Sequence, residues 1–199
     1  MKYLLISLFS IFLSGCLTTV VPAKSEYRIK PDIEAVENKS DNCKTKSLKI
    51  AQAFSSSTLM SNHMMYSIGE LKQYAYAESL WAENPNTIIT SSILKLMRDT
   101  HVFKSVQMSK SRSRSDFILE INIEDFMQYF DEASSHSQAS ISMTLTLIDI
   151  KSNRVVSTKT FDAIVDVQDL NAQGGVKGLK EALNIILKDV NTWIIGVCK

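Results

Sequence analysis

Three segments in the second half of the chain alternate apolar and polar residues, and this alternation is the strongest constraint on the fold. They are residues 117–123, 139–150 and 155–165. Because successive side chains of a β-strand point to opposite faces, such a strand has one face in a hydrophobic core and the other in water. Residues 151–153 have turn character, so we expect the last two segments to form a long hairpin.

Apolar residues spaced three and four apart predict two amphipathic helices. The first is expected after residues 84–87, which include helix-capping types, and should end near Arg98 and Asp99. The second is expected near the C-terminus, after a loop at Gly174 and Gly175. Their apolar stripes are Ile88, Ile89, Ile93, Leu94, Leu96 and Met97, then Val176, Leu179, Leu183, Ile186, Val190, Trp193 and Ile194.

Shorter apolar segments complete the fold. Residues 48–54 alternate like a strand, residues 64–68 and 71–76 flank the turn residue Gly69 like a hairpin, and residues 102–106 are typical of a short strand. The order is therefore three strands, a helix, a strand, three strands and a helix. We predict a single α+β domain with a mostly antiparallel sheet and two helices packed on one face.

The N-terminus has the pattern of a secretory signal peptide. A basic start is followed by an apolar run over residues 3–13, which is too short to span a bilayer comfortably, and by the sequence Leu-Ser-Gly-Cys at residues 13–16. This sequence resembles the bacterial lipobox, so we expect residues 1–15 to be removed and Cys16 to be lipidated. Several acyl chains hold a protein on a membrane almost permanently. A soluble secreted protein with an incidental cysteine is the alternative.

The remainder divides into a tether and a domain. Residues 16–44 are polar, include Pro22 and Pro31, and lack sustained periodicity, so we expect a lipidated N-terminus followed by a flexible tether. Residues 45–199 are then a globular domain. The mature chain of about 184 residues is large enough for one domain with a real core.

Two cysteines remain after lipidation of Cys16. In an oxidising compartment, Cys43 and Cys198 are expected to form a disulfide that joins the two ends of the domain. The alternative is a pair of buried free thiols. No His or acidic residue stands at ligand spacing from either cysteine, so we predict no metal site.

The sequence carries no recognisable catalytic arrangement. His63, His101 and His136 are far apart in the chain, and there is no Gly-rich phosphate loop or nucleophile elbow. We therefore predict that the protein is not an enzyme and needs no cofactor. A net charge of +1 gives no electrostatic footprint for nucleic acid, and the basic residues 110–114 are expected in an exposed loop.

Two groups of large apolar side chains are candidates for partner binding. Phe126, Met127, Tyr129 and Phe130 follow the first alternating strand; exposed, they would form a partner site, and buried, they would continue the sheet. Tyr66, Tyr74 and Tyr76, with nearby methionines, allow the same two interpretations. We take the first group as the candidate partner-binding residues.

The chain resembles the ABC-type transport auxiliary lipoproteins. The resemblance rests on the lipobox, on an aromatic segment that runs through Trp81 to Pro85, on the helix that follows, and on residues 103–106 and 116–126. It covers roughly residues 45 to 195. The aromatic segment before the proline is its most specific element.

This resemblance implies a non-catalytic accessory of a transport system that pairs an ABC transporter with an MCE-domain protein. Such systems move lipids between the two membranes of a cell envelope, and the accessory docks the MCE component at the outer membrane, facing the periplasm. Leu17 after the lipidated cysteine agrees with outer-membrane sorting. The resemblance leaves open whether the protein is a homo-oligomer. A structural or assembly lipoprotein of the outer membrane is the alternative, and genes for an MCE protein and an ABC permease alongside would favour transport.

Overall fold

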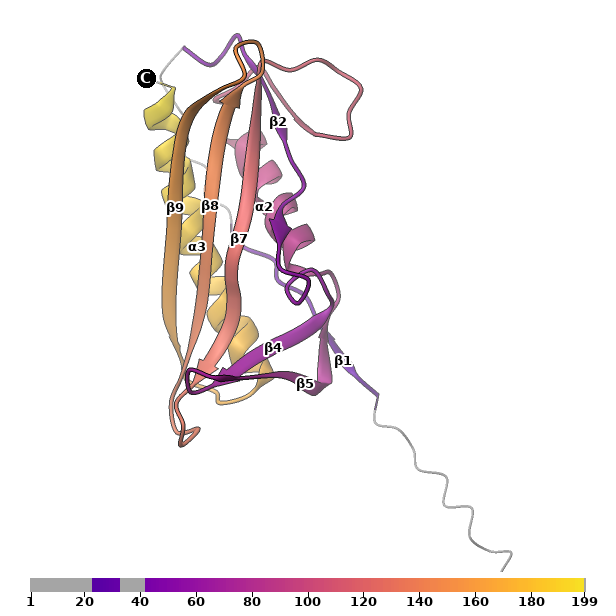
Figure 1. The fold of residues 1–199 in the computed structure, drawn as a ribbon, viewed down its shortest axis with the longest axis vertical. Helices are drawn as coiled ribbons and strands as arrows, with labels where there is room; N and C mark the ends of the chain where they lie inside the picture. The colour runs from indigo at the N-terminus through magenta and orange to yellow at the C-terminus, as the bar shows by residue number, and fades with distance from the viewer. Residues whose placement is uncertain (1–22, 33–41, 199) are drawn as a thin grey trace, which may run out of the picture.

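The structure, a computed structural model, describes residues 23–32 and 42–198. Within these residues the chain forms a mixed sheet of nine strands and two helices that pack on one face of it (Figure 1). The predicted α+β class is therefore confirmed. The sheet is mixed rather than purely antiparallel, because several short strands join the long ones in parallel.

Three long strands form an antiparallel meander. Their register pairs Ile121 with Leu145 and Met143 with Phe161, and all four side chains are buried on the face that the helices cover. The alternation that the sequence predicts is confirmed for residues 117–123, 139–149 and 157–165, whereas a bulge interrupts it near Val155, which is exposed. The three strands are β7 (Phe117–Phe130), β8 (Ser137–Asp149) and β9 (Arg154–Val167).

The second edge of β7 accepts three short strands in succession. β2, β3 and β4 each pair with it in parallel; β6 then pairs in parallel with β2. β5 pairs with β4 in the predicted antiparallel hairpin, and β1 lies parallel to β5. The bounds are β1 (Ser25–Tyr27), β2 (Ser47–Ile50), β3 (Phe54–Ser55), β4 (His63–Ile68), β5 (Lys72–Trp81) and β6 (Ser105–Met108).

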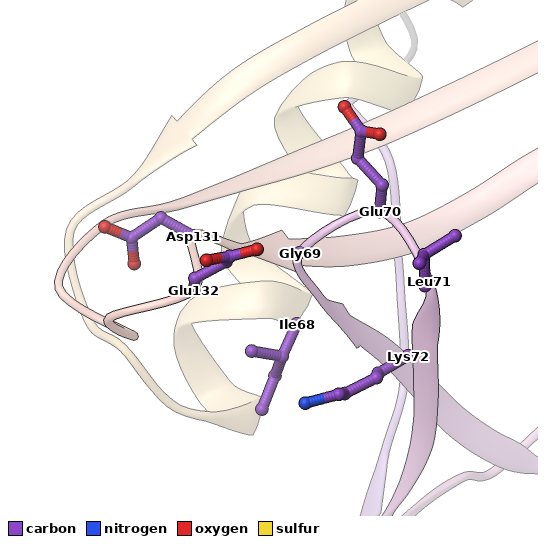
Figure 2. A pocket seen from close by; sticks show the side chains of 7 residues that line it. All are labelled: Ile68, Gly69, Glu70, Leu71, Lys72, Asp131 and Glu132. Carbon is purple, nitrogen blue, oxygen red and sulfur yellow. The ribbon is translucent and has the colours of Figure 1, made fainter.

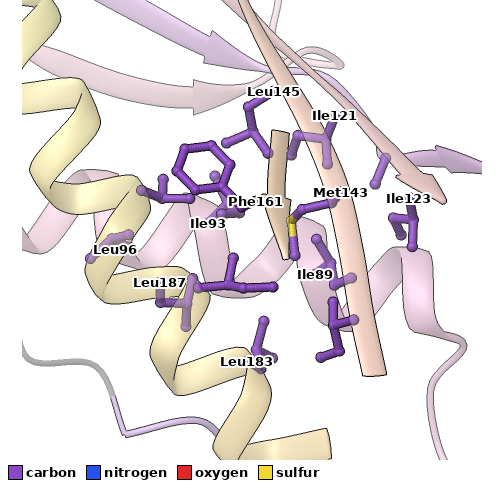
Figure 3. Packing of buried hydrophobic residues seen from close by; sticks show 14 of the residues in the cluster. Ile89, Ile93, Leu96, Ile121, Ile123, Met143, Leu145, Phe161, Leu183 and Leu187 are labelled. Carbon is purple, nitrogen blue, oxygen red and sulfur yellow. The ribbon is translucent and has the colours of Figure 1, made fainter. Parts of the chain in front are cut away.

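Both helices contribute an apolar stripe to one core. α2 (Pro85–Asp99) and α3 (Ala172–Val197) bury these stripes against the inward side chains of the long strands (Figure 3). Burial of this apolar area is the main stabilising contribution to the fold. Figure 3 labels ten residues of the core: Ile89, Ile93, Leu96, Ile121, Ile123, Met143, Leu145, Phe161, Leu183 and Leu187.

α3 begins earlier than the sequence predicts. Gly174 and Gly175 belong to its first turn, and Oδ1 of Asn171 accepts a hydrogen bond of 2.9 Å from the N–H of Gly174. At Gly178 an added Cβ would lie 2.7 Å from side chains of β8 and β9. Gly178 therefore serves a close approach of helix to sheet, and this approach outweighs its poor helix propensity.

Residues 23–32 pack against the folded domain, although the sequence predicts that they belong to a flexible tether. β1 pairs with β5, Ile29 is buried, and Asp32 forms an exposed ion pair with Lys180 at 2.8 Å. A strand of three residues is too short to show a periodicity. The folded part of the chain thus includes residues on the N-terminal side of residue 45.

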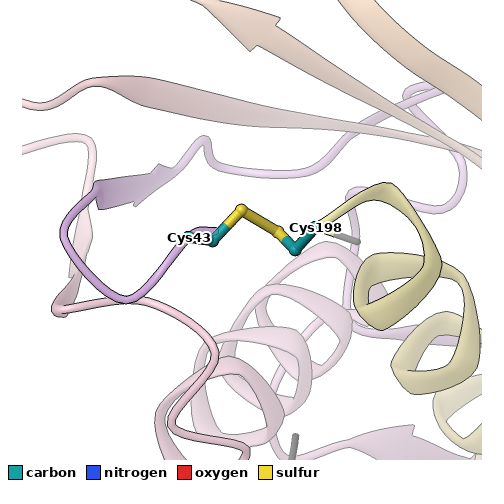
Figure 4. The surroundings of a disulfide bond; sticks show 2 residues. All are labelled: Cys43 and Cys198. Carbon is teal, nitrogen blue, oxygen red and sulfur yellow. A yellow bond between two sulfur atoms is a disulfide. The ribbon is translucent and has the colours of Figure 1, made fainter. Parts of the chain in front are cut away.

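A disulfide joins Cys43, which precedes β2, to Cys198, which follows α3 (Figure 4). The two Cα atoms lie 5.5 Å apart, and both residues are buried. The bond closes a loop with a sequence separation of 155, which contains most of the domain. It therefore ties the start of the second strand to the end of the last helix.

We predict that removing this bond lowers the thermal stability of the domain. In a chain with Cys16→Ser, the further changes Cys43→Ser and Cys198→Ser should cost about 2–4 kcal/mol, because the unfolded chain gains freedom. The corresponding drop in Tm is roughly 5–15 °C. Circular dichroism during heating measures the drop. Two reactive thiols in the denatured, unreduced Cys16→Ser chain would contradict the bond.

Candidate functional site

The four residues singled out in the sequence lie on the C-terminal part of β7, beyond a β-bulge in that strand. Alternation places Phe126 and Phe130 on the helix-covered face and Met127 and Tyr129 on the opposite face. Phe126 is only 1% exposed, and its ring packs edge-on against Trp81 with centroids 5.8 Å apart. Phe126 is therefore a core residue, whereas the other three are half-buried.

Phe130 belongs to a cluster of four aromatic rings from β4, β5 and β7. The ring of Tyr66 is central: its centroid lies 5.5 Å from that of Tyr74, 4.5 Å from that of Tyr76 and 5.7 Å from that of Phe130. Neither helix packs extensively on β4 or β5. The rings are consequently only partly covered, and Tyr74 is 41% exposed. We call Tyr66, Tyr74, Tyr76 and Phe130 the aromatic cluster.

A buried amide holds the aromatic cluster in place. Gln128 is 1% exposed; its Oε1 accepts a hydrogen bond of 2.8 Å from the hydroxyl of Tyr76, and its Nε2 donates one of 2.9 Å to Oγ of Ser137. An added Cβ at Gly175 would lie 2.1 Å from Gln128 Oε1, so only glycine lets α3 approach this amide. Burial, followed by the neighbouring Tyr66, raises the pKa of Tyr76, which therefore stays neutral.

An acidic cleft of about 730 Å³ lies next to the aromatic cluster, between the β4–β5 turn and the β7–β8 turn (Figure 2). Glu70, Asp131 and Glu132 line it, together with Lys72. Hydrogen bonds from Ser135, and then from the N–H of His136, lower the pKa of Asp131, which keeps this carboxylate ionised. The cleft therefore carries a net negative charge at neutral pH.

The β4–β5 turn connects the cleft to the aromatic cluster. Gly69 has φ of +62°, a left-handed conformation that favours glycine, and its N–H donates a 3.0 Å hydrogen bond to the carbonyl of Phe130. The next apolar residue, Leu71, is 95% exposed at the turn. We call the aromatic cluster and the acidic cleft together the hairpin-end site.

The opposite face of β7 is polar. Tyr129 donates a hydrogen bond of 2.9 Å to Oδ1 of Asp125, and burial raises the pKa of this carboxyl group. Further along the face, Glu124 accepts hydrogen bonds from Ser142 and Thr144 of β8. Tyr129 and Met127 therefore border a hydroxyl-rich surface and do not join the aromatic cluster.

The three histidines lie in different parts of the fold. His63, His101 and His136 lie at the start of β4, after α2 and before β8, respectively. Within residues 23–32 and 42–198, no group of three or more His, Cys, Asp or Glu side chains is placed to hold a metal ion.

The hairpin-end site contains groups suited to binding. Its aromatic rings beside carboxylates fit a partner that offers apolar and basic side chains.

The sequence indicates part of this site. The aromatic pattern of residues 64–76 predicts the hairpin that carries Tyr66, Tyr74 and Tyr76. Their proximity to Phe130 depends on the parallel register of β4 with β7, which pairs Ile68 with Phe130. No local pattern reveals that register, so the cleft between the two turns could not be predicted.

Residues 27–191 match the family of ABC-type transport auxiliary lipoprotein components. The chain belongs to this family. The resemblance that the sequence shows is thereby confirmed, and the family consists of lipoproteins that act as auxiliary transport components. None of the curated proteins matches the chain. No helix among the described residues is long and apolar enough to cross a membrane.

Solved structures share the fold. Protein XCC0632 from Xanthomonas campestris has a TM-score of 0.76 at 15% identity, over 87% of this chain and 96% of its own. An uncharacterised protein has a TM-score of 0.63 at 14% identity, over 87% of this chain and 99% of its own. Protein CT253 from Chlamydia trachomatis has a TM-score of 0.50 at 10% identity, over 77% of this chain and 98% of its own.

We predict that two phenylalanines of β7 differ in their effect on stability. Phe126→Ala should cost about 3–5 kcal/mol of unfolding free energy, because it leaves a cavity in the core beside Trp81. Phe130→Ala should cost less than about 2 kcal/mol, since Phe130 is only partly buried. Urea denaturation of both variants gives the two values. Equal losses would show that Phe130 belongs to the core as well.

Proposed function

We propose that this protein is a periplasm-facing lipoprotein of the outer membrane that docks the MCE-domain component of an ABC-type intermembrane lipid transport system. Membership in the auxiliary family supports an association with transporter components. The observation that carries the docking role is the hairpin-end site, where partly exposed aromatic rings border an acidic cleft. The protein acts by binding and performs no chemistry of its own.

The composition of the site defines the partner surface. Aromatic side chains bury much area with few rotatable bonds, so they dominate the binding energy of many interfaces. Tyr74 and Leu71 are the more exposed apolar groups of the site. The carboxylates of Glu70, Asp131 and Glu132 favour basic side chains on the partner. The docking surface of the MCE component should therefore present apolar residues ringed by Lys or Arg.

The membrane anchor rests on the sequence. Cys16 lies outside the described residues, and the lipobox pattern together with the lipoprotein family supports its acylation. Leu17 after the cysteine supports sorting to the outer membrane. An anchored chain would hold the hairpin-end site at the membrane surface, where an MCE component that spans the envelope would meet it.

We predict that Cys16→Ser abolishes acylation. The variant should fail to incorporate labelled palmitate and should leave the membrane fraction, because the folded domain offers no membrane-spanning helix among its described residues. Fractionation and autoradiography of both forms provide the test. Continued incorporation of label by the variant would place the anchor at another residue.

We predict that Tyr74→Ala and Phe130→Ala each weaken binding to the MCE component encoded by the same genome. The loss should be about 1 kcal/mol or more per ring, which corresponds to at least about a five-fold rise in Kd. Surface plasmon resonance with the purified partner measures it. Raising the salt concentration should weaken binding further, because exposed charges of the cleft contribute.

Phe54→Ala is the matched control. Phe54 is an aromatic residue of β3 that is 67% exposed and lies outside the hairpin-end site, so its loss should leave Kd unchanged. Equal effects of all three changes would contradict the assigned surface. If the unaltered protein binds no MCE or ABC component of its genome, the transport role is wrong and a structural or assembly lipoprotein takes its place.

A further inference from the structure

The outer edge of β9 is long, and no other strand covers it within the described residues. β9 pairs with β8 along one edge only, and it forms a margin of the sheet in Figure 1. Its 14 residues include no proline. Such an edge presents backbone N–H and C=O groups that can pair with another strand, and soluble monomers usually block it.

Apolar side chains are exposed along this strand. Val155, Val156 and Ile164 are 60%, 46% and 64% exposed. A bulge at the N-terminal end of β9 interrupts its pairing with β8 near Val156, but the ladder from Ser157 to Val167 is regular. An open backbone edge together with exposed apolar surface is typical of a strand that acquires a partner.

The charges of β9 are separated along the strand. Arg154 and Lys159 lie in its N-terminal half, whereas Asp162 and Asp166 lie in its C-terminal half. An antiparallel partner of the same sequence places the basic half of each strand beside the acidic half of the other. A parallel partner in the same register would place like charges together, which is unfavourable.

We propose that β9 pairs with β9 of a second copy of this chain, antiparallel about a two-fold axis at Thr160. On the face away from the helices, this register places Thr158 opposite Asp162 of the second copy, and it brings Ile164 toward Val156 at the bulge of the second copy. Thr160 stands opposite Thr160 at the axis. Apolar residues thus meet apolar residues, and no carboxylate stands opposite another carboxylate.

Three neighbouring registers are less favourable. Residues opposite each other in an antiparallel pair share a face, so the two-fold axis must pass through a residue. An axis at Lys159 or at Asp162 would place two like charges directly opposite each other. An axis at Phe161 would separate Ile164 from Val156. The axis at Thr160 avoids both costs.

The resulting dimer has one sheet that continues across two chains. The end of β9 lies beside the start of β8, because Val167 pairs with Ser137, and the hairpin-end site is at this end of the sheet. Antiparallel pairing therefore leaves one hairpin-end site at each end of the joint sheet. The dimer does not depend on the proposed transport role, since β9 contributes no residue to that site.

Cysteine cross-linking in membranes tests the register. Oxidation of the full-length Thr160→Cys variant should give a disulfide-linked dimer, because residues opposite each other at the axis have Cα atoms about 4.5–5.5 Å apart. Thr158→Cys is the matched control. Its two copies would lie about 14 Å apart along the strands, beyond the reach of a disulfide, so its yield should be about ten-fold lower.

Second measurements guard against misfolding and chance collision. Each variant should retain the Tm of the parent chain. Ile164→Lys added to Thr160→Cys should lower the dimer yield at least about five-fold, because it replaces an apolar side chain near Val156 of the second copy with a charged one. Equal cross-linking at residues 158 and 160, or a single-chain mass for the detergent-solubilised protein in sedimentation equilibrium, would overturn the proposal. An adduct with a different protein would overturn it in favour of another partner for the edge.

Discussion

The fold depends on β7, because both edges of this strand are paired. β8 occupies one edge, and β2, β3 and β4 share the other. Side chains alternate along a strand, so a shift of β7 by one residue would carry Leu119, Ile121 and Ile123 from the core to water. The bulge in β7 shifts the alternation of its side chains by one residue, and this is why Phe126 and Phe130 share the helix-covered face.

Alternation and helical periodicity predict the long strands and both helices, because these elements bury one face over many residues. Ile121 and Met143 lie in the core as expected, and the hairpin around Gly69 forms as expected. The alternation over residues 48–54 predicts a single strand that ends at Phe54. Instead β2 ends at Ile50 and Phe54 stands in a separate short strand, exposed to solvent.

The remaining differences arise from tertiary contacts that a local pattern does not contain. Parallel pairing of β2, β3 and β4 with β7 joins residues far apart in the chain. Glycine is a residue typical of loops, but Gly175 lies within α3, because its close approach to Gln128 leaves no room for a larger side chain. The candidate site has the same origin: the aromatic pattern of the hairpin is local, whereas its contact with Phe130 is not.

The pairing of β1 with β5 would limit how far the aromatic cluster can stand from a membrane that holds the proposed acyl group of Cys16. Ser25 pairs with Ser79 and borders the same shallow depression as Tyr76. The stretch from Cys16 to Ser25 spans at most about 30 Å when fully extended, which is about the thickness of a bilayer's hydrocarbon core. An acyl anchor at Cys16, as proposed, would therefore keep the aromatic cluster within reach of the lipid surface.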